Sequence, residues 1–164
     1  MATKPNRVLV TGSTGFTGQY LLRELSENGF EAVEFNVGPS LNSNGDLEAW
    51  DLRNQSFVDS KIRECDPTYV IHLAAISFVG HSSAKEMYDV NVLGTRNLLQ
   101  ALAQHGKSLE KVIIASSANV YGNSEDSLIT ERSSIRPMND YAVTKVAVEN
   151  LAAIYAKELP MVVT

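Results

Sequence analysis

Short apolar runs alternate with longer amphipathic segments along the chain. Runs rich in valine, isoleucine and leucine predict strands, and segments with apolar residues at helical spacing predict helices. The predicted strands cover residues 8–10, 31–35, 47–51, 68–75, 111–117 and 159–164. One predicted helix follows the first strand, and the others cover residues 56–64, 84–105 and 139–157. This alternation predicts an α/β fold, a doubly wound parallel sheet with strand order 3-2-1-4-5-6.

Some of the segments between these elements are polar. Residues 39–46 are rich in Gly, Asn and Ser and predict a loop, and residues 119–137 are mostly loop as well. Residues 68–75 form a continuous, mainly apolar run, which is typical of a strand buried on both faces of a parallel sheet. His72 within that run is expected to be a hydrogen-bonded core residue rather than a metal ligand, and no metal site is expected.

Three glycines follow the first predicted strand directly. Gly12, Gly15 and Gly18 are spaced G-x-x-G-x-x-G, and a helical pattern begins behind them with Leu21 and Leu25 on one face. Gly12 permits the turn, Gly15 lets the backbone approach phosphate oxygens, and Gly18 lets the helix pack against the strand. A strand, a glycine turn and a helix N-terminus together favour a Rossmann-type site for a dinucleotide pyrophosphate. The triplet alone is equally compatible with an ordinary tight turn between a strand and a helix.

Composition and charge limit the other possibilities. A chain of 164 residues with 44% hydrophobic and 20% charged residues is expected to form one globular domain. The net charge of −5, without a block of like charges, predicts neither a nucleic-acid partner nor a membrane partner. The single cysteine, Cys65, excludes an internal disulfide. No secretion signal or membrane-length apolar run is present, so a cytoplasmic protein is expected.

Two further segments carry candidate chemistry. Tyr141 and Lys145 are four residues apart and therefore share one face of a predicted helix. An ammonium close to a phenol favours the phenolate, which predicts a proton-transferring tyrosine, although many such pairs only decorate a surface. Ser116 and Ser117 leave the carboxyl end of a predicted parallel strand, where doubly wound folds bind ligands. Ser117 is a candidate to hydrogen-bond a substrate oxygen; the alternative is that both serines only cap a loop.

Six groups of residues occur in the order found in the extended short-chain dehydrogenase/reductases. They are residues 12–18, 51–52, 72–75, 91–95, 117–122 and 141–145. The chain resembles this family from about residue 7 to residue 164, and more narrowly it resembles the sugar-nucleotide epimerase/dehydratase/reductase group. The resemblance implies an NAD(P)-binding Rossmann domain over residues 1–164. It also implies that the chain stops in the last strand, before a substrate-binding domain, as the cofactor half of a longer protein.

The same resemblance assigns roles to individual residues. Ser117, Tyr141 and Lys145 match the catalytic serine, tyrosine and lysine. The implied cofactor-binding residues are Gly12, Thr14, Gly15, Phe16, Thr17, Gly18, Asn36, Asp51, Leu52, Leu73, Ala74, Ala75, Asn91, Tyr141 and Lys145. A homodimer through the helices at residues 84–105 and 139–157 is also implied, with a sugar nucleotide as the substrate.

Two departures from the family pattern narrow this reading. Asn36 stands where NAD-preferring members carry an aspartate, so the expected cofactor is NADP or NAD. Ala118 and Asn119 stand where the 4,6-dehydratases carry acidic residues, and neither can act as a general acid or base, so a dehydratase is disfavoured. The chain most resembles the GDP-4-keto-6-deoxy-mannose reductases, which implies reduction of a 4-keto-6-deoxy sugar nucleotide. The alternatives are an NAD-dependent sugar-nucleotide 4-epimerase and a non-catalytic NAD(P)-binding module.

Overall fold

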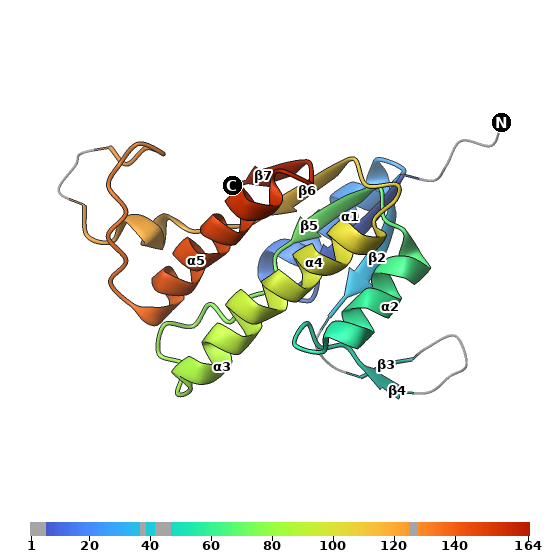
Figure 1. Ribbon diagram of the computed structural model, residues 1–164, viewed down its shortest axis with the longest axis horizontal. Helices are drawn as coiled ribbons and strands as arrows, with labels where there is room; N and C mark the ends of the chain where they lie inside the picture. The colour runs from blue at the N-terminus through green and yellow to red at the C-terminus, as the bar shows by residue number, and fades with distance from the viewer. Residues whose placement is uncertain (1–5, 37–38, 42–46, 125–127) are drawn as a thin grey trace.

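A five-stranded parallel sheet forms the centre of the molecule (Figure 1). The computed structural model describes residues 6–36, 39–41, 47–124 and 128–164. The strands are β1 (Arg7–Thr11), β2 (Glu31–Phe35), β5 (Tyr69–His72), β6 (Lys111–Ile114) and β7 (Met161–Val163), and their order is β2-β1-β5-β6-β7. β1 is an interior strand, since Val8 is in register with Ala32 of β2 on one side and with Tyr69 of β5 on the other. The predicted doubly wound parallel sheet is confirmed.

The predicted third strand does not join this sheet. Residues 47–51 contribute β4 (Leu47–Ala49), which pairs antiparallel with β3 (Pro39–Leu41) in a separate two-stranded sheet. A parallel neighbour of β2 requires a crossover of a dozen or more residues, whereas only residues 36–46 connect β2 to β4. The loop predicted at residues 39–46 is therefore wrong for Pro39–Leu41, and residues 42–46 lie outside the described part of the chain.

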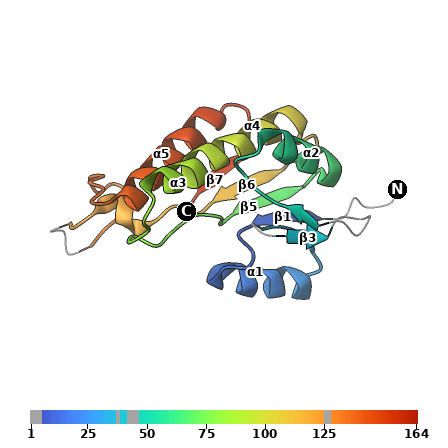
Figure 2. The ribbon, with the colours of Figure 1, turned by 90° about the horizontal axis from the view of Figure 1, so that it is seen from below.

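Helices cover both faces of the main sheet (Figure 2). α1 (Phe16–Glu27) lies on one face, and α2 (Gln55–Cys65), α4 (Thr95–His105) and α5 (Asp140–Tyr155) lie on the other. β1 supplies both layers of the core: Leu9 joins the cluster beneath α2, α4 and α5, while Val8 and Val10 pack against α1 with Leu25. Within the described residues, none of the helices is long and apolar enough to cross a membrane.

The segment predicted as one helix over residues 84–105 is helical throughout but not uniform. α3 (Ala84–Tyr88) continues into the π-helical segment η1 (Asp89–Gly94) and then into α4. A Cβ on Gly94 would lie 2.9 Å from the Cβ of Leu52, so glycine allows the helix to approach the loop after β4 closely. The wider π turn also carries Asn91, which is buried.

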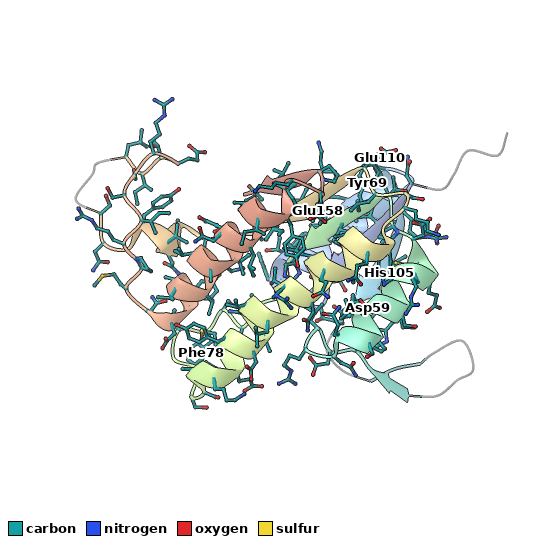
Figure 3. All side chains as sticks on the ribbon, viewed as in Figure 1. Asp59, Tyr69, Phe78, His105, Glu110 and Glu158 are labelled. Carbon is teal, nitrogen blue, oxygen red and sulfur yellow. The ribbon has the colours of Figure 1, made fainter. Side chains whose placement is uncertain are left out.

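Two predicted strands end earlier than expected, and both end at the same side of the sheet. The strand predicted at residues 68–75 is ordered as β5 only to His72, and the one at residues 111–117 ends as β6 at Ile114. Tyr69 and Glu110 mark the amino ends of these strands and share a 2.9 Å hydrogen bond, while Phe78 lies at the opposite end of the molecule (Figure 3). The residues beyond the carboxyl ends are therefore free to form the walls of a site.

Candidate active site

A cavity of about 610 Å³ lies beyond the carboxyl ends of β1, β2, β5 and β6. It brings together the predicted cofactor residues Gly12, Thr14, Gly15, Phe16, Thr17, Gly18, Asn36, Asp51, Leu52, Leu73, Ala74, Ala75, Tyr141 and Lys145. Asn91 is the one predicted cofactor residue that does not line it. Carboxyl ends of parallel strands are the general binding position in folds of this architecture.

Seven residues of the cavity wall were not among the predicted cofactor-binding residues. They are Arg53, Ile76, Ser77, Glu86, Val90, Ala115 and Ser116. Ile76 and Ser77 follow the predicted residue Ala75, and Ala115 and Ser116 precede the predicted residue Ser117, so the early ends of β5 and β6 account for these four. Glu86 and Val90 come from α3 and η1, and no local pattern in the sequence indicates that these two side chains face the cavity.

The glycine turn is held by close backbone contacts. Gly12 has a φ of +74°, and a Cβ there would lie 2.7 Å from the backbone nitrogen of Ala74. A Cβ on Gly18 would lie 2.5 Å from the Cα and the carbonyl oxygen of Ser13. The expected tight packing at Gly18 is therefore present, but the helix packs against the turn itself rather than against β1. A side chain at Gly12 or Gly18 would clash with the neighbouring backbone and distort this turn.

The start of α1 differs from the starts of other helices in the same chain. α2, α3 and α5 begin at Asn54, Ser83 and Asn139, whose side chains each accept a hydrogen bond from the first turn of the helix. α1 begins at Gly15, which has no side chain that could do so. The first residues of α1 also line the cavity. Backbone N–H groups and the positive end of the helix dipole therefore face the position where an anion would bind.

An ion pair lies at one edge of the cavity. The Arg53 side chain donates to Asp51, with Nη2 at 2.6 Å from Oδ2 and Nε at 2.9 Å from Oδ1. Hydrogen bonding to Arg53 holds the pKa of Asp51 below its ordinary value, so the carboxylate stays ionised. Asp51 is one of the implied cofactor-binding residues, and an ionised carboxylate is a suitable hydrogen-bond acceptor.

A buried chain of hydrogen bonds lies behind the cavity floor. His72 Nδ1 is 2.6 Å from Thr11 Oγ1, and His72 Nε2 is 2.8 Å from Thr95 Oγ1. All three residues are buried, and the prediction of a hydrogen-bonded core histidine is confirmed. Burial, with a contribution from the positive charge of Lys145, lowers the pKa of His72 to about 3, so the imidazole is neutral.

The partners of the two threonines fix which nitrogen of His72 carries the proton. The Thr95 hydroxyl donates to the backbone oxygen of Asn91 at 2.6 Å, so towards His72 it can only accept. His72 must therefore donate from Nε2, and its Nδ1 accepts from the Thr11 hydroxyl. The Thr11 oxygen in turn accepts from the backbone N–H of Ala74 at 3.2 Å. This chain ties the cavity wall at Ala74 to α4.

Asn91 supports the same wall from η1. Its side chain accepts from the N–H of Ile76 at 2.7 Å and donates to the carbonyl of Ile76 at 3.0 Å, as a neighbouring strand would. The same amide nitrogen donates to Thr144 Oγ1 at 3.1 Å, and the Thr144 hydroxyl donates to the Tyr141 carbonyl at 2.7 Å. Asn91 therefore connects the cavity wall to α5 from behind, without reaching the cavity.

Tyr141 and Lys145 lie on one face of α5 at the end of the cavity away from Asp51. Lys145 Nζ lies 5.8 Å from the centre of the Tyr141 ring and donates to the carbonyl oxygen of Ala115 at 2.8 Å. The side chains are 9% and 6% exposed, so this is a buried pair and not a surface decoration. Burial lowers the pKa of Lys145 to about 8.

Ser117 lines a second, adjoining groove of about 990 Å³. Its oxygen accepts from the N–H of Asn119 at 3.2 Å at the start of the 3₁₀ helix η2 (Ala118–Tyr121), so the serine does cap a loop, as one alternative held. That bond uses a lone pair of the oxygen and leaves the hydroxyl hydrogen for donation. Ser116 lines both hollows and donates to Glu149, so the two spaces meet at this strand end.

The chain matches one family model over nearly its whole length. The model is described as GDP-mannose 4,6 dehydratase, and it matches residues 9–164. That range includes the glycine turn, the buried hydrogen-bond chain and the Tyr141–Lys145 pair.

Two relatives of known activity are similar in sequence. A GDP-6-deoxy-D-talose 4-dehydrogenase from Aggregatibacter actinomycetemcomitans is 34% identical over 152 residues, covering 91% of this chain and 48% of that protein. A UDP-glucose 4-epimerase from Pisum sativum is 32% identical over 178 residues, covering 98% of this chain and 50% of that protein.

Among solved structures, the UDP-glucose 4-epimerase of Thermus thermophilus in complex with NAD superposes with a TM-score of 0.81 at 32% identity. The match covers 96% of this chain and 53% of that one. The chain thus spans about half the length of the proteins that it matches.

Proposed function

This chain belongs to the GDP-mannose 4,6-dehydratase family of the extended short-chain dehydrogenase/reductases, and we propose that it binds NAD or NADP and reduces a sugar nucleotide. The substrate class proposed is a 4-keto-6-deoxy sugar nucleotide of the GDP-4-keto-6-deoxy-mannose type. The relative that acts as a GDP-6-deoxy-D-talose 4-dehydrogenase supports this choice. The reverse of such a dehydrogenation is the reduction of a 4-keto group.

The observation that carries the proposal is the position of the buried Tyr141–Lys145 pair. It lies at one end of a cavity whose other residues suit a dinucleotide, next to the groove that Ser117 lines. A cofactor stretched from Asp51 to Lys145 would present its reactive end to a substrate in that groove. Gly15, with the uncapped start of α1, would hold the pyrophosphate.

Tyr141, Ser117 and Lys145 have separate roles in the proposed proton transfer. When bound, the reduced cofactor supplies a hydride to the C4 carbonyl carbon of the sugar. The Tyr141 phenol donates its proton to the carbonyl oxygen, and a hydrogen bond from Ser117 stabilises the negative charge that develops on that oxygen. The Lys145 ammonium stabilises the phenolate left on Tyr141 and is held in place by the Ala115 carbonyl.

A sugar-nucleotide 4-epimerase is the second candidate. The UDP-glucose 4-epimerases from Pisum sativum and Thermus thermophilus support it, since they match nearly the whole chain. An epimerase would use Tyr141, Lys145 and Ser117 in both directions, with the cofactor reduced and reoxidised in place. Cofactor that copurifies and does not exchange favours the epimerase, whereas exchangeable cofactor favours the reductase.

A 4,6-dehydratase fits the site less well, despite the family's description. The 4,6-dehydratases that this chain resembles carry acidic residues for water elimination after the active-site serine or threonine, and Ala118 and Asn119 at these positions can act neither as an acid nor as a base. Both of these side chains are exposed at the start of η2.

Tyr141→Phe separates an enzyme from a non-catalytic NAD(P)-binding module. The assay follows nicotinamide absorbance after GDP-4-keto-6-deoxy-mannose is added to the protein encoded by the complete gene. We expect the variant to lose about 10²–10⁴ in rate and to keep its cofactor affinity, because only the proton donor is removed. Turnover by the variant at the parent rate would exclude this mechanism. Cofactor binding without turnover by the parent protein would favour the module.

A further inference from the structure

Glu34 lies behind the residue that occupies the ribose-reading position. It is on β2, two residues before Asn36, and its Oε2 is 2.5 Å from Ser13 Oγ and 3.1 Å from Asn36 Nδ2. Asn36 Nδ2 is also 2.6 Å from Ser13 Oγ, and Asn36 Oδ1 accepts from the N–H of Thr14 at 3.3 Å. Three polar side chains and the glycine turn therefore form one connected group at the cavity wall.

The hydrogens available in this group determine how the Asn36 amide is oriented. Ser13 has one hydroxyl hydrogen, and the shorter contact to the Glu34 carboxylate takes it, although Asn36 Oδ1 is also near at 2.9 Å. The two amide hydrogens of Asn36 then go to Glu34 and to the Ser13 oxygen. The reversed amide would set Oδ1 against the Glu34 carboxylate and Nδ2 against the N–H of Thr14. Two acceptors and two donors would then oppose each other, so the reversed orientation is excluded.

This orientation makes Asn36 behave towards a ligand as an acceptor. Both of its hydrogens are used within the protein, and Oδ1 is the atom that keeps a lone pair for a bound ribose. A ribose 2′-hydroxyl can donate to that oxygen. A 2′-phosphate at the same place has no hydrogen to give as a dianion and meets the negative charge of Glu34 directly behind the amide.

Few basic residues are placed to bind a 2′-phosphate at this position. No lysine or arginine occurs between Arg23 and Arg53. Arg53 does line the cavity, but its guanidinium is bound to Asp51. The other lining cation, Lys145, donates to the Ala115 carbonyl at the far end.

We propose that Glu34, acting through Asn36 and Ser13, makes this site selective for NAD over NADP; this inference rests on the proposed function as a dinucleotide-binding protein. Glu34 supplies the negative charge that Asn36 lacks, and it fixes Asn36 in the orientation that reads an unmodified ribose. Glu34 thus determines cofactor specificity without contacting the cofactor, because Asn36 lies between the two.

The test is calorimetric titration of the chain with NAD and, separately, with NADP. We expect NAD to bind about 10- to 100-fold more tightly than NADP, the range for a doubly charged phosphate near one partly screened carboxylate. Glu34→Gln should reduce the ratio to about threefold or less, chiefly through tighter NADP binding. Glu31→Gln is the matched control, because it removes the same charge from the other end of β2, where Glu31 pairs with Arg7 at 3.1 Å, and should leave the ratio unchanged.

The possible results distinguish the proposed role of Glu34 from the proposed dinucleotide-binding function on which it rests. Equal affinities in the parent chain, or an unchanged ratio in Glu34→Gln, would overturn the role of Glu34 while leaving the cofactor site intact. Failure of both nucleotides to bind a folded parent chain would reject the cofactor site and the selectivity together. Circular dichroism of each variant verifies the fold, and Glu34 is exposed, so its substitution is not expected to disturb the core.

Discussion

Replacing Thr11 with valine tests the buried chain of hydrogen bonds behind the cavity floor. Valine keeps the branched shape of threonine and removes only the hydroxyl. That hydroxyl donates to His72 Nδ1 and accepts from the N–H of Ala74, and Thr11 is 0% exposed, so water cannot replace it. The substitution therefore leaves one buried acceptor and one partly buried donor unpaired.

The expected loss follows from the number of groups left unpaired. Each unsatisfied buried polar group costs about 1–3 kcal/mol, so the free energy of unfolding should fall by about 2–6 kcal/mol. This is a large part of the roughly 5–15 kcal/mol by which a domain is typically stable. Thr11→Ser keeps the hydroxyl and loses one methyl group, so it should cost only about 1 kcal/mol. Urea unfolding followed by circular dichroism measures all three proteins.

Thr95→Val is the control that separates a loss of stability from a loss of cofactor affinity. Thr95→Val also removes two hydrogen bonds, one from His72 and one to the Asn91 carbonyl, but it does not release Ala74 at the cavity wall. We expect both valine variants to lose stability, and Thr11→Val to lose more NAD affinity. In ¹⁵N-histidine spectra, the parent His72 should be protonated at Nε2. Protonation at Nδ1, or a Thr11→Val variant within about 0.5 kcal/mol of the parent, would refute the assigned directions of these bonds.

Three other changes give separate tests. Lys145→Met should remove a pH-dependent gain in the free energy of unfolding of about 1–3 kcal/mol, because burial lowers the pKa of Lys145 from 10.5 to about 8. The unfolded chain binds more protons between pH 8 and 10.5, so parent stability should gain from this group as pH rises, and a matching gain in the variant would contradict the assignment. Gly18→Ala should weaken NAD binding at least about tenfold in calorimetry, since its Cβ would lie 2.5 Å from the Ser13 backbone; unchanged affinity would mean that the turn is not the phosphate site. We also propose a homodimer through the helices at residues 84–105 and 139–157, where Leu93 and Ile154 are 51% and 63% exposed; Leu93→Glu with Ile154→Glu should yield monomers in sedimentation velocity, and a parent that is already monomeric would exclude the dimer.

The sequence predicts best where one local pattern decides the structure. The glycine turn is an example, because strand, turn and helix follow one another within residues 7–27. β2 is observed with the predicted bounds, Glu31–Phe35. Helical spacing predicts that Tyr141 and Lys145 share one face, and the helix predicted at residues 139–157 is observed as α5, Asp140–Tyr155, with Asn139 as its capping residue.

Other features depend on contacts between distant segments, which no local pattern contains. β4 pairs with β3 because the connection from β2 is too short for a parallel crossover, and its own sequence does not show this. Gly94 in the π-helical segment η1 packs against Leu52, 42 positions earlier in the chain, and no local pattern shows this contact. The orientation of the Asn36 amide depends on Glu34 and Ser13 together, so the sequence at Asn36 alone predicts only that the cofactor is NADP or NAD.

The central claim is that the cavity beyond the carboxyl ends of β1, β2, β5 and β6 is a dinucleotide site. The most direct measurement titrates NADH into the chain and follows energy transfer from Trp50, the single tryptophan, which immediately precedes the cavity residue Asp51. We predict saturable quenching of Trp50 with one NADH bound per chain, and competition by NAD. A folded chain whose Trp50 emission is unaffected by NADH, and which releases no heat on mixing, would contradict the account.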